Sequence, residues 1–133
     1  MYTYKATVDR VIDGDTVDLC VDLGFNMQIA RERFRLYEID APESRTRDEE
    51  EKVYGKMAKH YLQELLPVGQ QVFVETIMDK KGKFGRYLGK IFLPEVVRSV
   101  NQMMVDDHHA VLYEGQSKEH IAHLHLLNRG YFK

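Results

Sequence analysis

Alternating apolar residues in the first forty positions are the feature that most constrains the fold. The runs 4–12 and 16–23 both alternate apolar and polar residues, as in Val17, Leu19 and Val21. Such alternation indicates strands with one buried face, and the Asp-Gly pair between the two runs is typical of a β-hairpin turn. The alternation resumes over 27–39, after a turn at Gly24, and Ala41-Pro42 ends it. The sequence therefore predicts three consecutive strands.

The hydrophobic pattern changes to a helical period after Thr46. Apolar residues recur at three- and four-residue spacing over 53–66, which predicts a helix with one buried face. We expect Thr46 and Glu49 to form a capping box at its start and Pro67 to Gly69 to end it. The acidic residues 48–51 suit the positive end of the helix dipole, so they have a structural explanation.

The remaining elements complete a fold of five strands and three helices. The runs 71–78 and 86–93 read as a second hairpin, and its connecting loop is basic and contains glycine. Ser99 and Ser117 are expected to begin two further helices, the second of which Gly130 can end. At 133 residues, the chain has the size of one domain, so we expect a single globular domain over 1–133.

Composition and charge limit the functions that this chain can have. A net charge of −2 and a pI near 6.3 argue against a protein that coats nucleic acid through a broad basic surface. The single cysteine, Cys20, excludes an intramolecular disulfide and is expected to be a small core residue. No sequence segment has the length and apolarity of a signal peptide or a membrane span, which predicts a soluble, intracellular, cytoplasmic protein.

Charged residues gather at two junctions where predicted strands end. Asp13 and Asp15 flank Gly14 in the first turn, a pattern that a hairpin turn and a binding site explain equally well. Arg35, Asp40 and Glu43 surround the end of the third strand. Burying unpaired charges is expensive, so such a cluster is better explained as a site for a hard cation and an anionic substrate.

Each residue type in this cluster has a role in phosphoryl chemistry. Aspartate oxygens bind hard cations, and a free Glu43 can take a proton from water. The planar fork of Arg35 fits a phosphate in two places, and Arg86 is a candidate for the second half of such a clamp. Together these residues predict metal-assisted chemistry on a phosphate ester.

The order of these motifs resembles the staphylococcal nuclease-like (thermonuclease) family. The shared segments cover about nine tenths of the chain and are Asp13 to Thr16, Arg35-Leu36, Asp40 to Glu43, Gly55 with Ala58, Gly85-Arg86, Asn101 and Ala110-Val111. The resemblance implies a mainly β fold with helices, namely a five-stranded OB-fold β-barrel with three α-helices. It also implies a calcium-dependent nuclease that hydrolyses phosphodiester bonds in DNA and RNA with little sequence preference.

The resemblance assigns roles to individual residues. Asp15 and Asp40 would bind calcium directly together with the backbone carbonyl of Ala41, and Asp13 would act nearby through water. Glu43 would be the general base, while Arg35 and Arg86 would hold the scissile phosphate and stabilise the transition state. Oxygen ligands also admit Mg²⁺ or Mn²⁺. We expect a monomer that prefers single-stranded substrate.

Further residues are candidates for substrate binding, each with a structural alternative. Lys81, Lys83, Phe84 and Tyr87 form a small basic patch with aromatic side chains, which a solvated hairpin explains as well. Tyr87 and Tyr113 can stack on a base or serve the barrel and its surface. A zinc site at His120, His123 and His125 is disfavoured, because the third histidine lies about 140° from the first around a helix.

Two departures from the family pattern bear on the expected fold and function. His108 stands where a glycine ends the second helix, so it must adopt a left-handed backbone or let that helix end differently. An acidic residue and a tyrosine of the basic loop are replaced, the tyrosine by Phe84. The alternative function is a non-catalytic OB-fold module that binds nucleic acid or a protein partner, but the full acid and arginine set favours the enzyme.

Overall fold

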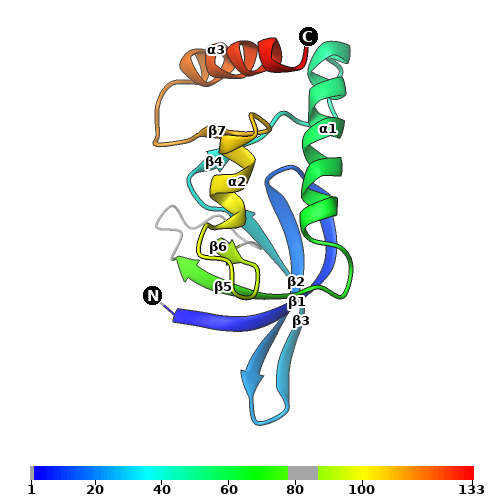
Figure 1. Ribbon diagram of the computed structural model, residues 1–133, viewed down its shortest axis with the longest axis vertical. Helices are drawn as coiled ribbons and strands as arrows, with labels where there is room; N and C mark the ends of the chain where they lie inside the picture. Colours follow the sequence, from blue (N-terminus) through cyan, green and yellow to red (C-terminus); the bar gives the residue numbers. More distant parts are fainter. Residues whose placement is uncertain (1, 78–86) are drawn as a thin grey trace.

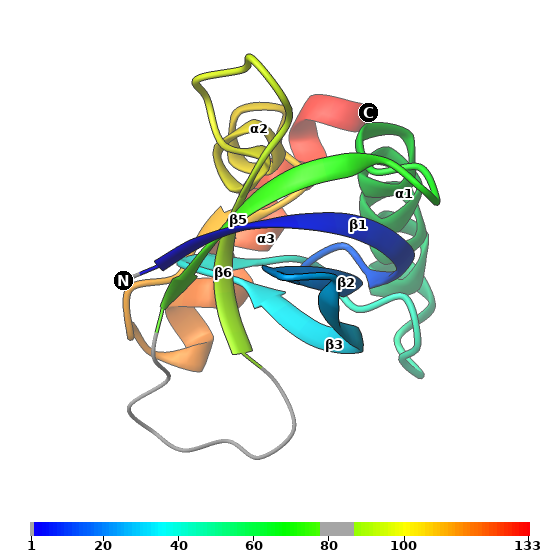
Figure 2. The ribbon, with the colours of Figure 1, turned by 90° about the horizontal axis from the view of Figure 1, so that it is seen from below.

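The five long strands form a closed barrel in the order β1-β2-β3-β6-β5 (Figures 1 and 2). The computed structural model describes residues 2–77 and 87–133. The barrel strands are β1 (Tyr2–Asp13), β2 (Thr16–Gly24), β3 (Met27–Leu36), β5 (Gln71–Ile77) and β6 (Tyr87–Phe92). The short strands β4 (Ile39–Asp40) and β7 (Val111–Leu112) pair with each other. The expected five-stranded OB-fold barrel is confirmed.

Three α-helices accompany the barrel, as expected. They are α1 (Glu49–Leu65), α2 (Val100–Asp106) and α3 (Lys118–Arg129), and a 3-10 turn, η1 (Gly130–Phe132), follows the last. In Figure 1, α1 runs beside the barrel and α3 lies across the end of the molecule opposite the β2–β3 hairpin tip. Within residues 2–77 and 87–133, no helix combines the length and apolarity needed to cross a membrane.

Alternate side chains of β2 point into the barrel interior and fill it. Val17, Leu19 and Val21 are buried, and side chains on a strand point alternately to its two faces. Cys20 therefore faces outward and is only half-buried, so its expected core placement is wrong. The buried face of α1, with Ala58 and Leu62, belongs to the same hydrophobic core.

Two expected boundaries are wrong for local reasons. The third strand ends at Leu36, because Glu38 adopts a left-handed φ of 64° that turns the chain before β4. Asp48, not Thr46, caps α1: its side chain accepts from the N–H groups of Glu50 and Glu51. Thr46 Oγ1 instead accepts from Asp48 N at 3.3 Å, so the capping box with Glu49 does not form.

The ends of α2 and α3 follow the sequence closely. Ser99 and Ser117 are the N-caps, as expected. His108 has a left-handed φ of 63°, one of the two expected outcomes, and its ring stacks on Tyr131 at 3.5 Å between centroids. Gly130 ends α3 with a right-handed φ of −60° and leads into η1.

Asn101 connects α2 to the barrel and to the turn before β4. Its buried side chain donates to the carbonyls of Tyr37 and Gly89, both at 3.0 Å, and accepts from Ile91 N at 3.1 Å. All three partners are backbone groups, which cost free energy when they are buried without a partner. One side chain thus fixes the approach of the chain to Asp40.

Asn101→Ala is expected to lower the free energy of unfolding by about 3 kcal/mol, because it removes three hydrogen bonds of about 1 kcal/mol each. Denaturant titration measures this loss. Gln102→Ala is the matched control, since Gln102 is exposed on the same helix and its side chain, within residues 2–77 and 87–133, bonds only Asp106; we expect a change within about 0.5 kcal/mol. Equal losses in the two variants would contradict the role of Asn101.

Candidate active site

Small residues let three segments of the chain meet at the barrel rim. A Cβ added to Gly14, in the β1–β2 turn, would lie 2.8 Å from the Cβ atoms of both Ala41 and Ala58. A Cβ added to Gly55, in α1, would overlap the Glu43 carbonyl and lie 2.6 Å from Ser44 N. The β1–β2 turn, the segment after β4 and α1 are therefore in contact at the backbone level.

Gly55→Ala is expected to push the 43–44 backbone away from α1 and to destabilise the protein by about 1–3 kcal/mol, the usual cost of overpacking. Thermal or denaturant unfolding measures the loss, and amide chemical shifts at 43–44 report the displacement. Gly130→Ala is the control, because its Cβ meets nothing within 4 Å and its φ suits alanine. An unperturbed 43–44 segment in Gly55→Ala would refute this account.

Arg35 lies between two carboxylates. Thr16 pairs with Arg35 across β2 and β3, and Asp15 O accepts from Leu36 N at 2.8 Å, so the β1–β2 turn sits beside the end of β3. Arg35 Nη2 is 3.0 Å from Asp40 Oδ1 and 3.9 Å from Asp15 Oδ2. The structure therefore brings these three predicted site residues together.

Backbone hydrogen bonds attach the remaining acidic residues to this cluster. Ala41 N donates to Asp15 Oδ2 at 3.0 Å, and Ser44 N donates to Asp13 Oδ2 at 3.4 Å. Glu43 lies between these two anchors, is exposed, and donates its own N–H to Glu51 Oε2 at 3.2 Å. The backbone thus holds Asp13, Asp15, Asp40 and Glu43 around one area of the rim.

The electrostatics of Asp15 suit a bound cation. Burial raises the pKa of the Asp15 carboxyl above its ordinary value and outweighs the Ala41 N–H and Arg35, which lower it. As the pH rises through that pKa, ionisation of Asp15 therefore lowers the stability of the metal-free protein. A cation shared with Asp40 would offset this cost, and calcium completes its shell with carbonyl oxygens and water.

Side-chain ligands for such a cation are few. Throughout the described residues, no group of three or more His, Cys, Asp or Glu side chains lies close enough to hold a metal ion. Asp15 and Asp40 would therefore depend on backbone carbonyls and water for further ligands. Such an oxygen-rich, partly hydrated set is typical of Ca²⁺ and Mg²⁺ sites.

Glu43 has the altered acidity expected of a carboxylate among other acids. Partial burial of its carboxyl group raises its pKa first, and the charges of Glu51, Asp13, Asp40 and Asp15 raise it further. A carboxylate with a raised pKa is a better proton acceptor near neutral pH than an ordinary glutamate.

Glu51→Gln is expected to lower the pKa of Glu43 toward its ordinary value, because it removes the largest of these charge effects while keeping an acceptor for Glu43 N. Carboxyl NMR titration of the metal-free protein measures the shift. Glu49→Gln, two positions away on α1, is the control and should leave the Glu43 pKa unchanged. A lowered pKa in both variants, or in neither, would contradict the assignment to Glu51.

The predicted substrate-binding residues fall into two groups. The ring of Tyr113 lies 5.5 Å from the Arg35 guanidinium carbon, and Tyr87, which is 54% exposed, packs its ring against Phe34. Tyr113 therefore borders the cluster, whereas Tyr87 is placed beside Phe34 on the neighbouring strand. Lys81, Lys83, Phe84 and the predicted catalytic residue Arg86 lie outside the described residues.

His125 is a site residue that the sequence reasoning missed. Its Nε2 atom lies 2.8 Å from Asp40 Oδ2, and its side chain is 11% exposed. His120 and His123 are exposed on the same helix, so α3 directs only the third histidine of this run to the acidic cluster. No spacing rule could reveal this contact, because its partners are 85 positions apart.

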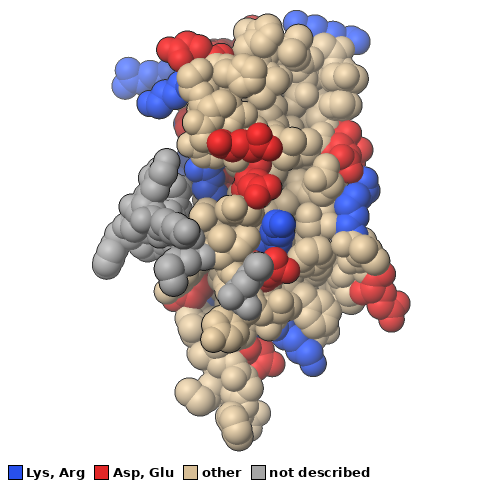
Figure 3. Space-filling model, turned by 90° about the vertical axis from the view of Figure 1, so that its left-hand side faces the viewer, with Lys and Arg blue, Asp and Glu red and all other residues tan. Residues whose placement is uncertain are grey.

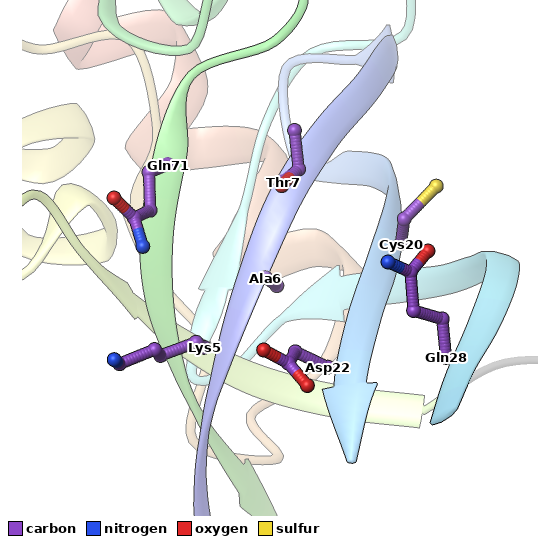
Figure 4. A pocket seen from close by; sticks show the side chains of 7 residues that line it. All are labelled: Lys5, Ala6, Thr7, Cys20, Asp22, Gln28 and Gln71. Atoms are coloured by element: carbon purple, nitrogen blue, oxygen red, sulfur yellow. The ribbon is translucent and has the colours of Figure 1, made fainter. Parts of the chain in front are cut away.

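A separate hollow on the outside of the barrel does not include any of the predicted site residues. It has a volume of about 90 Å³ and lies over β1, β2, β3 and β5 (Figure 4). Its lining residues are Lys5, Ala6, Thr7, Cys20, Asp22, Gln28 and Gln71. Its three β1 residues, Lys5 to Thr7, lie in the first half of that strand, whereas Asp13 ends it, so the acidic cluster is distinct from this hollow.

Comparison with known proteins supports the resemblance found in the sequence. The family described as staphylococcal nuclease homologues matches residues 33–129, well over half of the chain. The chain belongs to this nuclease family. The matched region contains Arg35, Asp40 and Glu43 of the cluster.

Two curated relatives show the same similarity in parts of larger proteins. The chain is 31% identical over 115 residues to the endonuclease YhcR of Bacillus subtilis, a match that covers 83% of the chain and 9% of that protein. It is 32% identical over 110 residues to the protein ParB of Escherichia coli, covering 76% of the chain and 52% of that protein. The nuclease-family chain thus spans less than a tenth of one relative and about half of the other.

Proposed function

We propose that this chain is a metal-dependent nuclease that hydrolyses phosphodiester bonds in single-stranded DNA and RNA as a monomeric domain over 1–133. The observation that carries the proposal is the position of Arg35, 3.0 Å from Asp40 and 3.9 Å from Asp15. An arginine between two carboxylates can hold a phosphate beside a cation. Membership of the nuclease family and similarity to an endonuclease support the same activity.

Arg35 has donors to spare for a phosphate. Among the described residues, its contacts with Asp15, Ile39 and Asp40 all use Nη2. A guanidinium carries five N–H donors, so the Nε–H and the two Nη1 hydrogens remain as donors to phosphate oxygens. The neighbouring Tyr113 ring and the 17% exposure of the Arg35 side chain limit its motion. Arg86 would supply a second guanidinium.

The acidic residues divide into ligands and a base. Asp15, Asp40 and the Ala41 carbonyl would hold calcium, with Asp13 acting through water and Mg²⁺ or Mn²⁺ as substitutes. The bound ion would supply positive charge that stabilises the phosphate oxygens during attack. Glu43 would take the proton of the attacking water, since it is exposed and its pKa is raised. Arg35 would stabilise the charge that builds on the phosphate oxygens.

Glu43→Gln is expected to lower cleavage of single-stranded DNA by about a hundred- to ten-thousandfold, because the amide cannot accept the proton of water. A fluorogenic oligonucleotide assay measures the rate, and the thermal midpoint checks the fold. Glu64→Gln is the control, since Glu64 is exposed on α1 and, in the part of the chain that the structure describes, pairs only with His60; its cleavage rate should match that of the native protein.

The same assay is run with Ca²⁺, Mg²⁺, Mn²⁺ or chelator on single-stranded DNA, duplex DNA and RNA. We expect the fastest cleavage with Ca²⁺ on single strands and none with chelator. Cleavage by Glu43→Gln at the native rate would reject the assigned base. Oligonucleotide binding without cleavage under any metal would instead identify a non-catalytic module.

A further inference from the structure

Four basic side chains line one open hollow beside Glu43. The hollow has a volume of about 510 Å³ and is lined by Ser44, Arg45, Thr46, Arg47, Lys52 and Lys56. The segment 44–47 leads into α1, and Lys52 and Lys56 are one helical turn apart, so they share a face of that helix. In Figure 1 this part of α1 lies next to the C-terminus. We call this hollow the basic groove.

The acidic residues next to the groove are engaged elsewhere. Asp48 caps α1, Glu50 pairs with Arg129 at 3.3 Å, and Glu51 accepts from Glu43 N. None of these three lines the groove. The lining of the groove therefore carries four basic side chains and no carboxylate.

The cations of the groove have little internal compensation. Lys52 is 3.8 Å from Glu49, whose side chain is 84% exposed, and such surface pairs are weak. Within residues 2–77 and 87–133, Arg45, Arg47 and Lys56 have no ion pair within 4.0 Å. By contrast, basic and acidic side chains are mixed on the face of the molecule shown in Figure 3. An anionic ligand would relieve the repulsion among the groove cations.

The loop that carries the groove has a fixed shape. Ser44 is buried, with its N–H on Asp13, and Thr46 accepts from Asp48 N. Gly55 packs against the 43–44 backbone from the helix side. The groove cations are therefore presented on a supported backbone, directly next to the candidate base.

We propose that the basic groove binds the phosphates of the nucleic-acid strand on one side of the cleaved bond. This inference rests on the proposed nuclease function for the identity of the strand. Arginine and lysine without a carboxylate among the lining residues suit phosphates, and the lining has no aromatic ring on which a base could stack. The groove therefore adds affinity without sequence preference and makes long substrates better than short ones.

The test removes three groove charges in the variant Arg45→Gln/Arg47→Gln/Lys56→Gln. Fluorescence anisotropy with a labelled 12-mer of thymidylate, in chelator to prevent cleavage, gives the affinity over a range of NaCl concentrations. Each lost phosphate contact on a single strand lowers the slope of log K against log salt by about 0.7, so a decrease of about 2 is expected. The thermal midpoint checks that the variant is folded.

The control Lys5→Gln/Lys118→Gln/Lys133→Gln removes the same charge from exposed positions outside the groove. This control should keep the native salt slope, because the slope reports phosphate contacts in the groove and not the net charge of the protein. Cleavage provides the second measurement: with metal, the groove variant should lose rate on the 12-mer but not on a thymidine dinucleotide, which has no phosphate beyond the cleaved one.

The outcomes separate this inference from the proposed function. An unchanged salt slope in the groove variant overturns the inference, whether or not the native protein cleaves DNA. A reduced slope together with a native protein that cleaves neither substrate supports the groove and rejects the nuclease. If the groove residues are needed for binding to phosphatidylserine vesicles and the protein does not bind the 12-mer, the inference is also overturned. The groove would then bind a membrane surface and not a nucleic-acid strand.

Discussion

The contact between α1 and the segment that follows β4 determines where every acidic residue of the candidate site lies. Gly55 allows the helix backbone to touch Glu43 and Ser44, and Gly14 fits against Ala41 and Ala58. A side chain at either glycine would separate segments that are distant in sequence. The chemistry of the rim thus depends on residues that carry no functional group of their own.

Charge balance is the second constraint, and it limits how the cluster can exist without a ligand. Asp15 is half-buried, Asp40 shares its two oxygens between Arg35 and His125, and Glu43 stays exposed. These environments give the three carboxylates different partners and different accessibilities. A set of similar residues can therefore divide into those that hold a cation and one that takes a proton.

Most of the fold could be predicted from sequence, because strand alternation and helix capping are local signals. The barrel strands and the caps Ser99 and Ser117 follow from residues a few positions apart, whereas the left-handed backbone of His108 was one of two outcomes that the sequence left open. The misplaced features needed information that short windows lack. Thr46 and Asp48 both suit an N-cap, and only the turn between them decides which is used.

The site residues that follow strand ends could be predicted from the sequence. The contact that α3 makes with the site could not. Arg35, Asp15 and Asp40 meet because β2 pairs with β3 and the chain turns at Glu38. His125 reaches Asp40 only through the way α3 packs, which no periodicity encodes. Likewise, the separation of Arg45 and Arg47 from the acids at 48–51 depends on the partners that those acids find in three dimensions.

The attachment of α3 has a consequence for the dynamics of the rim. None of its residues is fully buried among the described parts of the chain, and polar contacts attach it to the rest, among them Asn128 with Ala110, Arg129 with Glu50 and His125 with Asp40. Such an element opens at a lower free energy than the barrel beneath it. Each transient detachment of this last helix would release one oxygen of Asp40 to solvent, so the terminal segment and the rim fluctuate together.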